Sequence, residues 1–137
     1  MAQAHPDPTS HTDILIVDAD TAIGESMQLL FSTAGFSAIA VNAVGVADDA
    51  VFTYSPRCLV IAAEMAPVAG VEWLAQIRRK GINIPAVVVA SRGDVPTAVA
   101  AMRAGASDFL EKPLVDARLL QSVRRLLQAP DRQITVR

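Results

Sequence analysis

The sequence is poor in cysteine, in charge and in long apolar runs. Its 137 residues include one cysteine, so no disulfide can form within the chain, which favours a reducing compartment. No apolar stretch approaches the ~20 residues that span a bilayer. The first 13 residues also lack the basic and apolar blocks of a signal peptide. We therefore expect a cytoplasmic protein that does not engage membranes.

Charge is sparse and nearly balanced. Charged residues make up 19% of the chain, and the formal net charge is -2. Nonspecific binding to nucleic acid needs a basic surplus, which this chain lacks, so we expect no direct nucleic-acid contact. Apolar residues make up 52%, and the length suits one domain. We expect a tail over 1–12, a folded domain over 13–129 and a second tail over 130–137.

Short apolar runs alternate with amphipathic segments along the chain. The runs predict strands over residues 14–17, 37–41, 58–61, 86–89 and 107–110. The amphipathic segments predict helices over residues 21–34, 43–54, 71–80, 95–104 and 117–129. Strict alternation predicts an α/β fold with a doubly wound, five-stranded parallel sheet in the order 2-1-3-4-5.

Several residues have predicted roles within these elements. Asp94 is expected to cap the fourth helix, whose apolar positions are Val99 and Met102. The apolar side of the second helix includes Phe52. Cys58 lies in the unbroken central run, so we expect a buried packing thiol rather than a reactive one.

The strand ends are the natural place to look for chemistry. In an open α/β sheet, ligands bind beyond the carboxyl ends of the strands. The central strand ends in alanine there, which offers no reactive group. The residues expected to surround this crevice are Asp18, Ala19, Asp20, Ala62, Ala90, Ser91 and Lys112.

Two blocks of sequence, Arg92–Pro96 and Ala101–Pro113, resemble the response-regulator receiver domains of bacterial two-component signalling. They are most similar to the receivers that usually carry a LuxR-type helix-turn-helix effector. The resemblance covers about residues 13–128 and implies the flavodoxin-like receiver fold. Receivers take a phosphoryl group from a partner's phosphohistidine onto their own aspartate, with magnesium held by nearby carboxylates.

The resemblance also assigns chemical positions, and three of them hold alanine. It places the phosphoacceptor on Ala62, the second magnesium carboxylate on Ala19 and the phosphoryl-binding hydroxyl on Ala90. An acyl phosphate cannot form on an alanine methyl. The first magnesium carboxylate matches Asp18 and the phosphate-binding lysine matches Lys112, which we expect to pair with each other. The resemblance thus implies a degenerate receiver without a cofactor, in which Asp18 would hold magnesium at most weakly.

Four further residues complete this region. Phe109 matches the aromatic switch residue of receivers, and Pro113 follows the lysine through a peptide bond that is cis in the family. Asp20 is expected to cap the first helix rather than bind metal. Ser91 lies one residue beyond the hydroxyl position.

We expect a stand-alone receiver that is not an enzyme and acts through protein contacts. Its expected partners are a histidine kinase or another response regulator. A homodimer through the fourth helix, fifth strand and fifth helix is a further expected contact. The charged residues proposed for that face are Arg103, Asp108, Arg118, Arg124 and Arg125.

Other functions stay open at this point. A non-standard acceptor, Asp20 or Glu64, would keep the receiver phosphorylatable. Glu64 itself either lies solvated in its loop or folds back towards Lys112. The chain would also suit the receiver part of a longer DNA-binding regulator. A flavodoxin-like cofactor binder is disfavoured, because residues 18–22 are acidic where a phosphate loop would be needed.

Overall fold

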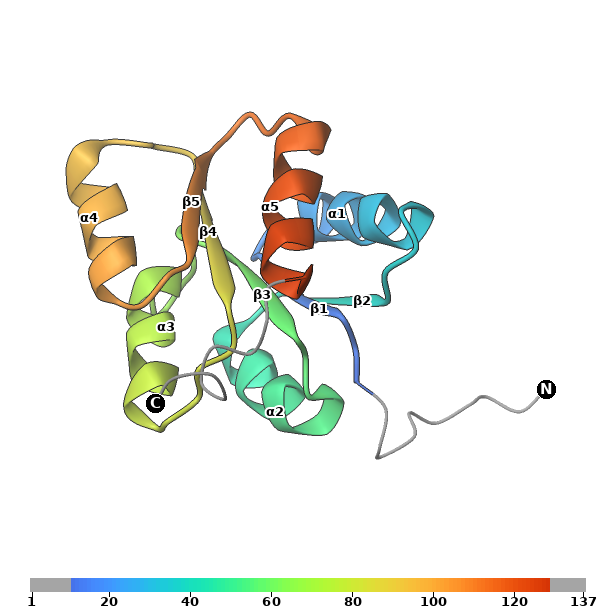
Figure 1. Cartoon of the computed structure of the whole chain (residues 1–137). Coiled ribbons are helices and arrows are strands. Elements are labelled where there is room, and N and C mark those ends of the chain that lie inside the picture. The colour runs from blue at the N-terminus through green and yellow to red at the C-terminus, as the bar shows by residue number, and fades with distance from the viewer. Residues whose placement is uncertain (1–10, 129–137) are drawn as a thin grey trace, which may run out of the picture.

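The computed structural model describes residues 11–128, which form a parallel sheet with helices on both faces (Figure 1). The strand order is β2-β1-β3-β4-β5, which confirms the predicted order. Most of the first predicted tail and all of the second lie outside the described residues. The strands are β1 (Ile14–Val17), β2 (Ala38–Val41), β3 (Cys58–Ala62), β4 (Ala86–Ala90) and β5 (Asp108–Glu111).

Helices cover each face of the sheet. Helices α1 and α5 pack on one face, and α2, α3 and α4 pack on the other (Figure 1). Each predicted element is present, with ends that differ from the prediction by one residue at most. None of the helices within residues 11–128 is long and apolar enough to cross a membrane. The helices are α1 (Thr21–Thr33), α2 (Val44–Tyr54), α3 (Gly70–Arg79), α4 (Val95–Arg103) and α5 (Asp116–Gln128).

The inner strands are apolar because they are covered on both faces. Every residue of β1, β3 and β4 is buried, as expected for the interior of a parallel sheet. The register pairs Val17 with Ile61, and Ala90 with Glu111. The carboxyl ends of these strands therefore meet at one edge of the sheet.

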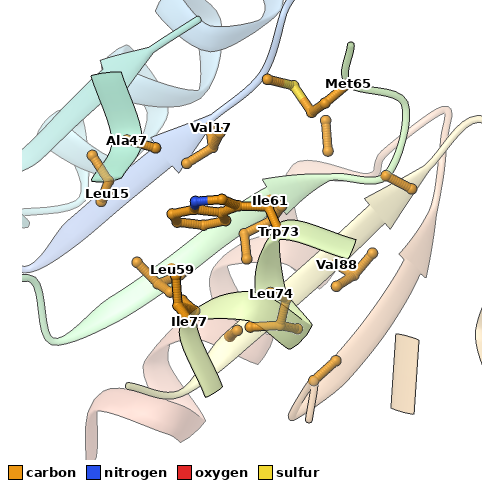
Figure 2. Close-up of a cluster of buried hydrophobic side chains, with 14 of the residues drawn as sticks. Leu15, Val17, Ala47, Leu59, Ile61, Met65, Trp73, Leu74, Ile77 and Val88 are labelled. Carbon is orange, nitrogen blue, oxygen red and sulfur yellow. The ribbon is translucent and has the colours of Figure 1, made fainter. Parts of the chain in front are cut away.

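Trp73 of α3 lies at the centre of the larger apolar cluster (Figure 2). It packs there with Leu74 and Ile77 against side chains of β1, β3 and β4. Its indole N–H donates a hydrogen bond of 2.8 Å to Oδ1 of Asp48 on α2. A buried N–H without a partner would be costly, so this bond completes the packing of the ring and joins α2 to α3.

The opposite face of the sheet has its own apolar cluster, between α1 and α5. Phe31 of α1 and Leu119 of α5 are buried in it, together with Cys58 of β3. Burial raises the pKa of the Cys58 thiol to about 12, so the thiol stays protonated at neutral pH. The prediction of a packing thiol is confirmed.

Three predicted inward positions are wrong. Phe52 is 71% exposed, because the inner position of α2 belongs to the preceding Val51 and successive helical residues point about 100° apart. In α4 the buried residue is Ala101, whereas Val99 and Met102 are exposed. The helix rests on the sheet through this small residue, so its larger apolar side chains lie on the outer side.

Candidate functional site at the carboxyl ends of the strands

The predicted crevice residues gather at the carboxyl edge of the sheet. Asp18 follows β1, Ala62 ends β3 and Ala90 ends β4. Lys112 follows β5, and its N–H donates a hydrogen bond of 2.8 Å to the carbonyl of Ala90. The structure therefore brings together residues that lie far apart along the chain.

Lys112 and Asp18 form the predicted ion pair. Nζ of Lys112 lies 3.5 Å from Oδ2 of Asp18. Strands β3 and β4 lie between β1 and β5, so the lysine side chain reaches across the ends of both. The Asp18 side chain is only 4% exposed, and its Oδ1 also accepts a 2.9 Å hydrogen bond from the N–H of Asp20. Both contacts compensate the burial of the carboxylate.

The remaining acidic side chain of this loop points to a helix instead of the crevice. Oδ1 of Asp20 accepts hydrogen bonds from the N–H groups of Ala22 and Ile23, at 3.0 and 3.2 Å, which confirms the predicted cap of α1. Within residues 11–128, no three His, Cys, Asp or Glu side chains are grouped as ligands of one metal ion. With alanine at position 19, these residues do not form the oxygen-rich set that magnesium prefers.

Glu64 makes a contact that neither sequence hypothesis described. The residue is exposed, as the hypothesis of a solvated loop glutamate requires, and both of its carboxylate oxygens accept a hydrogen bond of 3.1 Å from the backbone N–H of Ser91. The carboxylate is therefore directed at Ser91 rather than at Lys112, so the hypothesis that it folds back towards Lys112 is wrong. The loop returns closely onto β3 at Gly70, where a Cβ atom would overlap the carbonyl oxygen of Ala62. That close approach fixes the end of the loop that carries Glu64.

A second carboxylate, Glu111 at the end of β5, was missed by the sequence reasoning. Its Oε2 accepts a 3.1 Å hydrogen bond from the N–H of Gly93. One residue further on, Asp94 accepts a 2.9 Å bond from the N–H of Thr97 and caps α4 as predicted. Hydrogen bonds from Thr97 lower the pKa of the Asp94 carboxyl group.

The model for the response regulator receiver domain matches residues 14–124. This chain belongs to the response regulator receiver family. It is 34% identical over 112 residues to the transcriptional regulatory protein FixJ of Azorhizobium caulinodans, covering 82% of this chain and 53% of that protein. It is 34% identical over 119 residues to the C4-dicarboxylate transport transcriptional regulatory protein DctD of Pseudomonas aeruginosa, covering 87% of this chain and 26% of that protein.

The receiver thus spans about half the length, or less, of these curated relatives. Among solved structures, it resembles the receiver domain of NtrX from Brucella abortus, with a TM-score of 0.80 and 28% identity. That match covers 86% of this chain and 100% of the other. The flavodoxin-like receiver fold expected from the sequence is confirmed.

Phe109 and the Lys112–Pro113 peptide bond complete this region, and the cis form of that bond is the one that the resemblance implies. Phe109 is half-buried and packs against the larger apolar cluster. The peptide bond between Lys112 and Pro113 is cis, and so is the bond between Ala66 and Pro67. Pro113 itself is exposed beyond the end of β5.

The charged residues proposed for the receiver's α4–β5–α5 face divide into two groups. Oδ2 of Asp108 accepts hydrogen bonds from Oγ of Ser122 at 2.6 Å and from Nη2 of Arg125 at 3.1 Å. Asp108 and Arg125 therefore pair within the chain and tie β5 to α5. The remaining proposed residues of this face are exposed, and they are Arg103, Arg118 and Arg124.

Proposed function

We propose that this receiver signals through protein contacts without being phosphorylated. The observation that carries the proposal is Ala62, which ends β3 at the position that the family resemblance assigns to the phosphoacceptor. Ala62 is 3% exposed and pairs with Val89 in the sheet register. A methyl group cannot accept a phosphoryl group, so the usual covalent mark has no atom on which to form.

The rest of the crevice supports the same interpretation. Ala19 and Ala90 occupy the positions of the second magnesium carboxylate and of the phosphoryl-binding hydroxyl. Lys112 and Asp18 already compensate each other's charge at 3.5 Å. On this proposal the crevice needs no magnesium, and Asp18 holds the ion at most weakly.

The proposed output is contact with a histidine kinase or another response regulator in the cytoplasm, with no enzymatic step. The proposed contact face is formed by α4, β5 and α5, and it would also serve a homodimer. Met102 of α4 is 50% exposed and Arg103 stands beside it, so the helix offers both apolar and charged contacts. Interfaces with an apolar centre and a charged rim have this composition.

Treatment with a small phosphodonor and magnesium, followed by intact mass measurement, tests the proposal. We expect an unmodified mass, alongside full conversion of a control receiver that has an acceptor aspartate. An acid-stable adduct of about 80 Da, one phosphoryl group, would contradict it. Loss of such an adduct in Asp20→Asn or Glu64→Gln would identify the alternative acceptor.

A second candidate is the receiver part of a longer DNA-binding regulator. The observation in its favour is that the match covers 53% of FixJ, which is named a transcriptional regulatory protein. Immunodetection of the native protein distinguishes the two candidates by mass. A cellular product much larger than the 14.5 kDa of this chain would support the longer regulator.

A further inference from the structure

Helix α4 is the helix that the apolar core holds least. One of its nine residues, Ala101, is buried, whereas four residues of the neighbouring α3 are buried. Figure 1 shows α4 at the edge of the molecule, next to β5. Apolar burial therefore contributes little to the position of α4, and other contacts have to supply what burial does not.

Two carboxylates bind the backbone of the loop that leads into this helix. Glu64, in the loop after β3, accepts a hydrogen bond from the N–H of Ser91 at both carboxylate oxygens, at 3.1 Å. Glu111, the last residue of β5, accepts a hydrogen bond from the N–H of Gly93 at 3.1 Å. We use the name carboxylate clamp for the carboxylates of Glu64 and Glu111 together with the amides of Ser91 and Gly93.

The clamp holds the loop from both sides. Strands β3 and β5 are the two neighbours of β4 in the sheet, so Glu64 and Glu111 approach the loop after β4 from opposite directions. Gly93 permits the approach, because a Cβ atom there would lie 2.5 Å from the Glu111 carboxylate. Hydrogen bonds to a charged acceptor are about twice as strong as neutral ones, which suits them to fixing an exposed loop.

We propose that the carboxylate clamp sets the position of α4 and thereby the presentation of its outward side chains to a partner. The loop continues without a break into the cap residue Asp94 and the first residue of α4, Val95. Release of the amides of Ser91 and Gly93 therefore removes the hydrogen bonds that tie the start of the helix to the loop after β3 and to β5. The inference rests on the proposed function, since a receiver that signals without a phosphoryl group needs this loop held by its own side chains.

Amide hydrogen exchange of the full chain, measured by NMR, tests the clamp. In Glu64→Ala we expect the Ser91 amide to exchange about tenfold faster or more. In Glu111→Ala we expect the same of the Gly93 amide, because each variant removes a hydrogen bond to a charged group. The amides of α4 should exchange faster in both variants, and fastest in the double variant. The amides of α3 keep their rates, because burial holds that helix.

Conservative variants separate the charge of the clamp from its reach. Glu64→Asp keeps the charge but has a side chain shorter by one methylene, so the Ser91 amide should exchange as fast as in Glu64→Ala. Glu64→Gln keeps the side-chain length but loses the charge, so the Ser91 amide should exchange at an intermediate rate. Glu25→Ala, at an exposed position of α1, is the matched control and changes no exchange rate in α4.

Three results would overturn the proposal. Unchanged rates at Ser91 and Gly93 would show that the clamp does not form in solution. Faster exchange at these amides without any change in α4 would show that the helix is positioned by other contacts. Equal acceleration of α3 and α4 would show that the variants weaken the whole fold. The assay uses no phosphodonor, so it fails or succeeds independently of the mass experiment.

Discussion

The core beneath α3 and the carboxyl edge of the sheet are held by different forces. Beneath α3, buried apolar side chains such as Trp73, Leu74 and Ile77 fill the space between helix and strands. At the carboxyl edge, charged side chains hold the loops, and α4 has one buried residue. Apolar burial fixes the fold, whereas polar contacts at the edge fix the local geometry of the loops.

A polar contact serves a different purpose in each region. In the core, the Trp73–Asp48 hydrogen bond satisfies a donor that packing has buried, at 2.8 Å. At the edge, the Lys112–Asp18 pair is longer, at 3.5 Å, and spans the ends of two intervening strands. The first contact completes apolar packing, and the second compensates a carboxylate that the crevice has buried.

The largest loss of stability is expected in the core. Trp73→Ala removes a fully buried ring and should lower the free energy of unfolding by about 3–5 kcal/mol, measured by urea denaturation with circular dichroism. Trp73→Phe keeps most of the apolar volume but loses the indole N–H, so the free energy of unfolding should fall by about 1–2 kcal/mol. A loss below about 1 kcal/mol for Trp73→Ala would refute the central role given to this ring.

A smaller loss is expected at the crevice. Lys112→Met leaves the buried Asp18 carboxylate without its cation and should cost about 1–2 kcal/mol in the same assay. The cost of the double variant Asp18→Asn/Lys112→Met should be less than the sum of the single variants, because both act on one contact. Lys80→Met, at an exposed position after α3, is the control and should be neutral. Additive costs would show that the ion pair does not stabilise the fold.

The smallest effect is expected on the outer side of α4. Met102→Ala and Val99→Ala should each change the free energy of unfolding by no more than about 0.5 kcal/mol, because their side chains are exposed. A loss of 2 kcal/mol or more, about the cost of emptying a core position, would show that α4 is buried in solution and remove the contrast with α3.

Local patterns were enough to predict the elements of the fold. The short apolar runs became strands within one residue of their predicted ends, and Asp20 and Asp94 cap the helices expected of them. These signals depend on neighbours along the chain, through helical period and capping chemistry. The same signals misplaced Phe52 and Met102, because an apolar side chain does not by itself indicate which face of a helix meets the sheet.

The sequence alone predicted the strand order and the pairing of Lys112 with Asp18, and the structure confirms both. Only the tertiary structure decided that Glu64 meets the amide of Ser91, 27 residues away, and that Glu111 meets Gly93, 18 residues away. Both contacts join loops and strand ends that the sheet brings together. The pattern of one segment cannot encode them, because each needs the position of a neighbouring strand before a partner amide comes within reach.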